Sequence, residues 1–187
     1  MLSLEYIAGC IDCDGSISIS ISENRYKNKT GNASPQFAFI INFRQVQQYK
    51  YIVEEIKNTL GVGAVYDHAA SSNTSTAMSS WQTTKHEETL EVCKILRPYL
   101  HIKQKEADLM IEALDLWLGN TGERKGVGYS RPDWVKVRVR EISKAMNPSQ
   151  QKESSRRNKE IRDDFVAPFY EQEGIASINF SQGLVGE

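Results

Sequence analysis

A nearly unbroken alternation of isoleucine and serine, SISISISEN at positions 16–24, narrows the possible folds of this chain more than any other feature. A period of two places the isoleucines on one side of a strand and the serines on the other. A second alternating run, QFAFIINFR at 36–44, follows the loop-like stretch NKTGNASP. The two runs therefore predict an antiparallel hairpin with a long loop, one apolar face and one polar face.

Helical patterns and a second pair of strand patterns surround this hairpin. Helices are expected at 4–13, 47–60 and 87–96, and the second strand pair at 61–69 and 77–84. The predicted order is helix, strand, strand, helix, strand, strand, helix, which defines an α+β fold. Two further helices are expected at 103–118 and from Asp133 to about Met146.

The length of 187 residues is typical of one domain. The periodic patterns fade after Pro148, and the sequence beyond it is polar up to about Lys159. We therefore expect a core at 1–147 and a polar, partly helical and partly flexible extension at 148–187.

Several classes of protein are disfavoured by composition. The sequence has no run of the roughly 20 apolar residues that cross a bilayer, and its first segment carries Glu5, Asp12 and Asp14, unlike a signal peptide. We therefore expect an intracellular protein that is neither secreted nor bound to a membrane. The odd number of cysteines, three, argues against a disulfide framework, and the scattered histidines argue against a histidine metal site.

The charges are unevenly distributed along the chain. A net charge of −1 does not by itself indicate a nucleic-acid-binding protein. However, the window 24–53 contains no Asp or Glu, and the segment 136–162 is mainly basic. We therefore expect a positive face on a nearly neutral chain, with Lys27, Lys29 and Lys50 contacting phosphates.

The segment YIAGCIDCDG at 6–15, joined to the serine and isoleucine strand, resembles the LAGLIDADG motif of homing endonucleases. Three further segments resemble the single-motif, homodimeric branch of that family: NFRQVQQ at 42–48, LGVG at 60–63 and RPYLHIKQKEADL at 97–109. No second copy of the motif follows. The resemblance implies the family's αββαββα core with a saddle-shaped antiparallel sheet, here with additional C-terminal helices.

The same resemblance implies a function. We expect a site-specific, Mg²⁺-dependent endonuclease that acts as a homodimer and makes a staggered double-strand cut in a long, roughly palindromic DNA site. It would need no small-molecule cofactor, and its location would be an organelle, either chloroplast or mitochondrion. The alternative is a non-cleaving nucleic-acid-binding protein, such as an intron splicing cofactor.

The motif also has a physical rationale. A helix with Ala8 and Gly9 on one side can approach a second helix closely, so both residues are expected at the dimer interface. Asp14 lies at the end of that helix, and two copies would bring two carboxylates together. Such a pair is costly unless a divalent cation lies between them, which suits Mg²⁺, with Mn²⁺ or Ca²⁺ able to occupy the same site.

Three other roles are implied by the resemblance. The backbone carbonyl of Cys13 would contact the metal, and Gln45 and Lys103 would support catalysis, whereas Asp12 would be a structural acceptor at the helix end. A lysine stabilises developing negative charge on a phosphate, and a glutamine can hold the attacking water. Alternatively, the two aspartates merely cap a buried helix and Lys103 is a solvated residue at a helix start.

The cysteine pair Cys10 and Cys13 forms a C-x-x-C sequence, which elsewhere indicates redox chemistry or half of a zinc site. No second such pair exists, and Cys93 is alone. We therefore expect the pair to pack at the small-residue positions of the motif.

DNA contacts are predicted from strand parity. Side chains opposite the apolar face carry hydroxyl, amide and guanidinium groups, which read base edges in a major groove that admits a β-ribbon. A polar face that merely meets solvent is the alternative. The expected DNA-binding residues are Ser18, Ser20, Ser22, Asn24, Gln36, Asn42, Arg44, Tyr66, His68, Ser80, Gln82 and Thr84.

Overall fold

The computed structural model describes residues 1–23, 35–70, 76–120, 124–125, 128–129 and 131–146. These residues belong to the unit formed by 1–147. The predicted extension at 148–187 lies outside the described residues, as do Asn24, Lys27 and Lys29. The proposed division of the chain therefore stays a prediction.

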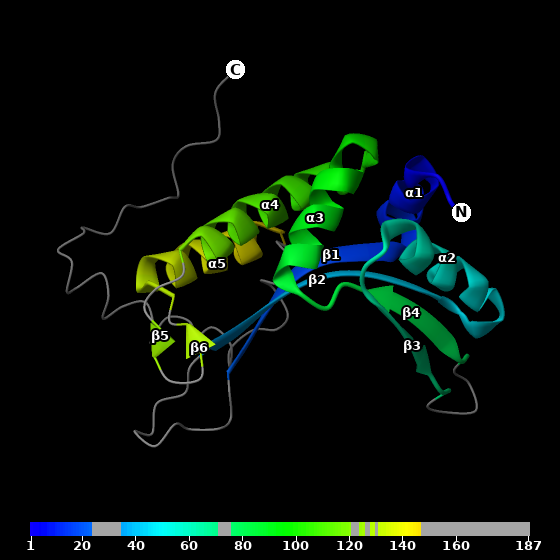
Figure 1. Cartoon of the computed structure of the whole chain (residues 1–187), viewed down its shortest axis with the longest axis horizontal. Coiled ribbons are helices and arrows are strands. Elements are labelled where there is room, and N and C mark those ends of the chain that lie inside the picture. The colour runs from blue at the N-terminus through cyan, green and yellow to red at the C-terminus, as the bar shows by residue number, and fades with distance from the viewer. Residues whose placement is uncertain (24–34, 71–75, 121–123, 126–127, 130, 147–187) are drawn as a thin grey trace. The chain divides into compact units, whose positions relative to one another are not determined.

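The predicted α+β order is confirmed (Figure 1). Helix α1 is followed by two strands, α2, two more strands and α3, and α4 and α5 complete the unit. The bounds are α1 Leu4–Asp14, β1 Gly15–Glu23, β2 Pro35–Val46, α2 Lys50–Leu60, β3 Ala64–His68, β4 Met78–Gln82, α3 His86–Leu96, α4 Gln104–Gly119 and α5 Asp133–Met146, with two-residue strands β5 Arg124–Lys125 and β6 Gly128–Tyr129. Short 3-10 turns at Gln47–Tyr49 and Arg97–Tyr99 precede α2 and follow α3.

The four main strands form one antiparallel sheet in the order β1-β2-β4-β3. Ile17 lies opposite Ile41, and Phe43 lies opposite Trp81, so the apolar positions of neighbouring strands share one face. The helices pack on this face, and β1 and β2 curve beneath them in Figure 1. None of the helices among the described residues is long and apolar enough to span a membrane.

The core lies between the sheet and the helices. Ile17, Phe39, Ile41 and Phe43 are all buried there, as their alternation predicts. Burying a side chain of this size contributes about 1.5–3 kcal/mol relative to leaving it exposed. The hairpin is therefore held mainly by the contacts of its apolar face with the helices.

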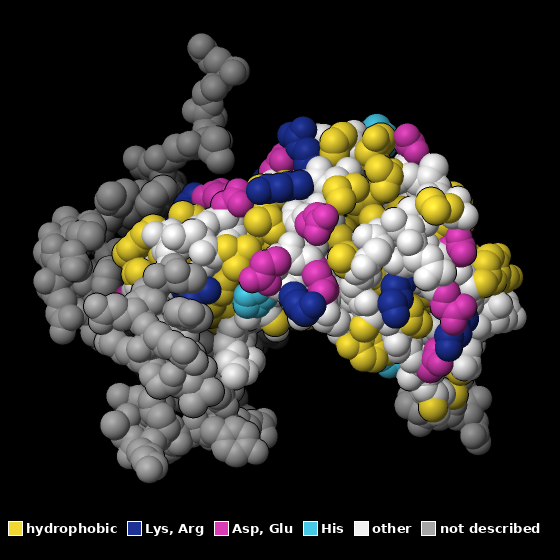
Figure 2. Space-filling model, in the orientation of Figure 1, with side chains coloured by type: hydrophobic (Ala, Val, Ile, Leu, Met, Phe, Trp, Pro, Cys, Tyr) yellow, Lys and Arg dark blue, Asp and Glu magenta, His cyan; other side chains and the backbone are white. Residues whose placement is uncertain are grey.

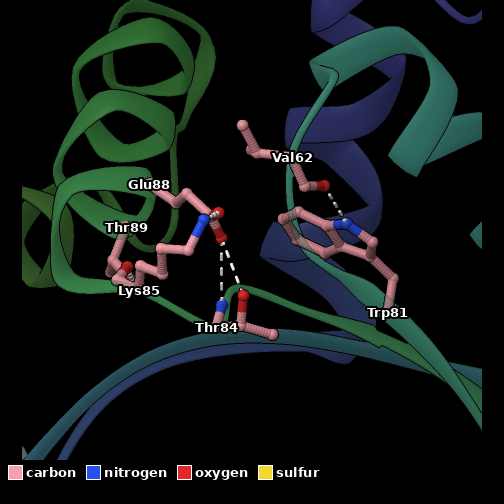
Figure 3. Close-up of polar contacts among 6 residues, drawn as sticks. All are labelled: Val62, Trp81, Thr84, Lys85, Glu88 and Thr89. Carbon is pink, nitrogen blue, oxygen red and sulfur yellow. Dashed lines mark hydrogen bonds and ion pairs between the residues drawn. The ribbon is translucent and has the colours of Figure 1, made fainter.

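Trp81 of β4 is fully buried, and its indole N–H donates to the carbonyl of Val62 at 3.0 Å (Figure 3). The chain passes close to this ring at Gly63, which has a positive φ of 84°. A Cβ at Gly63 would lie 2.5 Å from the indole nitrogen. Only glycine therefore fits the turn between α2 and β3.

The charged side chains of the helical layer largely pair with one another. Lys94 lies 3.2 Å from Asp115, and Arg97 lies 2.8 Å from Asp108. Figure 2 accordingly shows positive and negative side chains interspersed over the helices in this view. In the described part of the chain, this helical surface therefore has no continuous region of positive charge that could bind a polyanion.

Candidate active site

The predicted metal ligand Asp14 is the last residue of α1, and its side chain is exposed. The chain passes directly from this helix into β1, with the N–H of Gly15 donating to the carbonyls of Cys10 and Ile11. A Cβ at Gly15 would lie 2.7 Å from the Cα of Ile11. This tight junction explains the final glycine of the motif, and it holds Asp14 where the helix meets the sheet.

Asp12, two residues earlier, is buried and ties α1 to the segment that precedes α4. Its carboxylate accepts hydrogen bonds from the backbone N–H of His101 at 2.7 Å and of Lys103 at 2.8 Å. The Lys103 ammonium in turn donates to the backbone carbonyl of Asp12. Asp12 is thus a structural acceptor, but its partners belong to a distant segment rather than to the end of its own helix.

This arrangement brings the predicted catalytic residue Lys103 against Asp12, and Asp14 follows Asp12 by two residues at the end of α1. Lys103 is half-buried and directly precedes α4, so it is not simply a solvated residue at a helix start. The two partners are 91 residues apart in sequence. No local pattern in the sequence could have indicated this contact.

The contacts of Asp12 also set its protonation behaviour. Burial by itself raises the pKa of this carboxyl, but hydrogen bonds from the backbone N–H groups of residues 101–103, together with the charge of Lys103, outweigh it. The pKa of Asp12 is therefore lowered from its usual value. Because the native pKa lies below the unfolded value of about 4, the stabilisation is complete above that pH and is lost as the pH falls through the native pKa.

We expect Asp12→Ala to lower the free energy of unfolding by about 2–5 kcal/mol, because a buried carboxylate is removed and two part-buried backbone N–H groups lose their acceptor. Asp12→Asn keeps the size but cannot titrate, so the stability gap between it and the wild type should shrink below about pH 4. Urea unfolding at several pH values measures both effects. Asp14→Asn, at an exposed carboxylate, is the control and should change stability by less than about 0.5 kcal/mol.

Gln45 lies on β2 and is half-buried, and its side-chain oxygen accepts from the N–H of Val46 at 2.8 Å. The pairing of β1 with β2 begins at Gly15 and Phe43, so Gln45 follows two residues beyond that pair. Gln45 is therefore near the start of β1, but its side-chain oxygen already accepts a hydrogen bond from the next residue of its own strand. The assignment of Gln45 to catalysis stays a prediction.

Metal binding by one chain alone is not supported. The described residues contain no group of three or more His, Cys, Asp or Glu side chains that could hold an ion. The end of α1 offers two oxygen ligands that suit a hard cation. One is the exposed carboxylate of Asp14, and the other is the backbone carbonyl of Cys13, which lies in the last turn of the helix, where carbonyls have no intrahelical donor. The donors fit magnesium, but the described residues of one chain supply only part of a site.

One expectation for the interface is wrong. Ala8 is fully buried in the core of its own chain and cannot face a partner. The exposed residues of α1 are Glu5, Tyr6, Gly9, Cys13 and Asp14, and we call the first four of these the outer face. A Cβ at Gly9 would have no atom within 4 Å, so this face is open at its middle.

The polar positions of the sheet share the face opposite the helices, which we call the open face. The register places Arg44 beside Ser80, and Ser80 beside Tyr66. Most of the predicted DNA-binding residues are accessible here: Ser20, Ser22, Gln36, Arg44, Tyr66 and His68 are exposed, and Ser18, Asn42 and Gln82 are half-buried. The amide of Asn42 donates to the side-chain oxygen of Gln82 at 3.4 Å.

Two of the predicted contacts depart from this picture. Ser80 is only 1% exposed, because it lies in an inner strand between larger side chains, and its hydroxyl is 2.8 Å from Nε2 of His68. Thr84 lies beyond the end of β4, and its hydroxyl donates to the Glu88 carboxylate at 2.9 Å (Figure 3). Thr84 therefore belongs to the start of α3 rather than to the open face.

Lys50 also differs from its expected role as a phosphate contact. Its ammonium lies 2.7 Å from the carboxylate of Asp67, which also accepts a hydrogen bond from Ser79. The pairing raises the pKa of Lys50 and lowers that of Asp67. The charge of Lys50 is thus largely neutralised within the chain.

A model of the LAGLIDADG endonuclease family matches residues 7–111, and the chain belongs to this family. The DNA endonuclease I-CreI of Chlamydomonas reinhardtii is 27% identical over 113 residues, which cover 60% of this chain. The match spans 62% of I-CreI, somewhat less than two thirds of that protein.

Solved structures of homing endonucleases share the fold. I-TnaI superimposes with a TM-score of 0.60 at 17% identity, covering 78% of this chain and 88% of that one. The archaeal intron-encoded I-Vdi141I, solved in complex with DNA, gives a TM-score of 0.59 at 17% identity, covering 78% of this chain and 82% of that one. At these identities the likeness concerns the fold alone.

Proposed function

We propose that this protein is a site-specific endonuclease that binds double-stranded DNA as a homodimer and cuts both strands by metal-dependent hydrolysis. One observation carries the proposal: the exposed carboxylate of Asp14 stands at the junction of α1 with the sheet, and the ammonium of Lys103 contacts the backbone of Asp12, two residues earlier in the chain. A carboxylate, a nearby cation and a polar binding face are the groups that phosphodiester hydrolysis on DNA requires.

The dimer follows from what one chain lacks. A single copy offers one Asp14 carboxylate, whereas a staggered double-strand cut needs a metal-binding group near each of two scissile phosphates. Pairing through the outer face, which is open at Gly9, would bring the ends of two α1 helices together. Each active site would then lie beside the seam.

The residues have separate roles in the proposed reaction. The Asp14 carboxylate and the Cys13 carbonyl would hold magnesium, and manganese or calcium could occupy the same oxygens. Bound there, the ion supplies a Lewis acid that polarises the phosphoryl oxygen and activates water. The Lys103 ammonium has three donors, of which one binds the Asp12 carbonyl, and the others can stabilise charge on the phosphate. Gln45 would orient the attacking water.

The open face would enter the major groove. Arg44 carries the guanidinium group that pairs in two hydrogen bonds with guanine, and the amides of Gln36, Asn42 and Gln82 suit adenine. Backbone phosphates would be contacted by lysines of the acid-free window, including Lys27 and Lys29, but not by Lys50. An origin in an intron and a location in an organelle, both expected from the family resemblance, stay predictions.

The direct test is to incubate the protein with a randomised DNA library and Mg²⁺ and to sequence the cut ends. We expect one long, roughly palindromic site with both strands cut at staggered positions. The same reaction with Asp14→Asn is the control for contaminating nucleases. Enrichment of bound but uncut DNA would favour the alternative, a splicing cofactor or other non-cleaving binder, and the absence of both binding and cutting would reject the proposal.

A further inference from the structure

The side chains of two cysteines on α1 have no role in the proposed DNA cleavage. Cys10 and Cys13 are three residues apart, so they lie one turn apart on the same side of the helix. Cys13 is exposed and Cys10 is half-buried. Cys93 is different, because it is buried in the core and burial raises its pKa to about 12.

Cys13 belongs to the outer face, where the proposed dimer would have its seam, and Cys10 lies at the edge of that face. Cys13 follows Gly9 by four residues, so it lies one turn further along the outer face of α1. Burial, and then the nearby Asp14 and Cys13, raise the pKa of Cys10, whereas a hydrogen bond with Tyr6 lowers it. Both thiols are therefore neighbours of one another and of the end of the helix.

Pairing of the helices brings these thiols together. If two Asp14 carboxylates meet, the C-terminal ends of both α1 helices must lie side by side. Cys13, directly before Asp14, then approaches its counterpart, and the two Cys10 residues lie one turn back along the same seam. Two thiols from each helix, at positions i and i+3, resemble the way helix pairs hold metal ions between them.

We propose that Cys10 and Cys13 of two copies of this chain together bind one thiophilic divalent cation of the zinc class at the seam between their α1 helices. The proposal rests on the homodimer of the proposed function. Each chain holds half of a tetrahedral four-thiolate site, and the site is incomplete without the second copy. The described part of one chain alone offers no such group of ligands.

This site is chemically distinct from the one at Asp14. Thiolates select soft or borderline cations, whereas carboxylate and carbonyl oxygens select magnesium. Binding deprotonates the four thiols and releases their protons to solvent, with no change in oxidation state. The bound ion would link the two helices and favour the dimer.

The test is a titration of the reduced, full-length protein with Co²⁺ or Cd²⁺ in a non-thiol reductant. We expect thiolate-to-metal charge-transfer absorption that saturates at one cation for every two chains. The variants Cys10→Ser and Cys13→Ser should each abolish the four-thiolate spectrum. The variant Cys93→Ser is the matched control and should keep it, and Mg²⁺ should produce no such absorption.

Sedimentation with and without the metal gives the second readout. Since the cation binds only the paired helices, we expect the dimer dissociation constant to fall by about tenfold or more, and Cys10→Ser to remove this effect. Saturation at one cation for each chain, or no thiolate absorption in a protein that sediments as a dimer, would overturn the metal site and leave the endonuclease proposal intact. A monomer at all concentrations, on DNA and free, would overturn the proposed dimer as well.

Discussion

Asp14→Asn is expected to lower the rate of DNA cleavage by about a thousandfold or more while DNA binding is retained. The side chain is exposed at the end of α1, so the substitution disturbs no buried contact. Asparagine keeps the shape but removes the charge that would hold the cation between two helix ends. The open face, which would bind the DNA, is left unchanged.

The measurement is single-turnover cleavage of the DNA site selected from the library, with the affinity for the same DNA measured in parallel. Asp12→Asn is an informative comparison because it changes a carboxylate only two residues away. Its main effect should be on stability, and its loss of activity should follow the displacement of Lys103. Cleavage by Asp14→Asn at close to the wild-type rate would show that this carboxylate does not hold the metal.

Gly9→Leu is expected to raise the dimer dissociation constant by about a hundredfold or more, because the added side chain would enter the proposed twofold interface twice. Within its own chain, a Cβ at this position would meet nothing within 4 Å and the position is exposed, so the fold should tolerate the substitution. Sedimentation measures the association, and thermal unfolding verifies that the fold is intact.

Two further substitutions distinguish a loss of dimerisation from a loss of folding stability. Gly119→Leu, at the end of α4, also adds a leucine where a Cβ would meet nothing within 4 Å, and it should leave the dimer unchanged. Ala8→Leu should instead destabilise the fold by about 1–3 kcal/mol, because Ala8 is packed inside its own chain. A Gly9→Leu protein that dimerises like the wild type would place the interface elsewhere.

The sequence predicts the elements of this fold well because burial leaves a periodic trace in it. The alternation in β1 and β2 reports which side of each strand is covered, and this alone predicts that Ile17 and Ile41 share a face. The motif predicts that Asp14 ends a helix because glycine is needed where that helix turns into a strand. These inferences concern a residue and its own element.

What periodicity cannot report is which neighbour covers a side chain. The partners of Asp12 lie 89 and 91 residues away, and Lys50 is paired with a residue of β3. Ser80 has the parity of an accessible residue but lies in an inner strand between Arg44 and Tyr66. Ala8 and Gly9 are adjacent small residues, yet one is turned to the core and the other to solvent, because successive helical positions differ by about 100°.

The link from Asp12 to His101 and Lys103 has a consequence for protein engineering. A chimera that exchanges only the motif helix with that of a relative would separate the Asp12 carboxylate from the backbone donors that it contacts in this chain, even though every motif residue is kept. The exchangeable module therefore comprises α1 together with the segment 97–104. Grafting the two pieces jointly should keep Lys103 beside the end of α1, where the proposed active site lies, whereas grafting either alone should yield a folded protein in which Lys103 is misplaced.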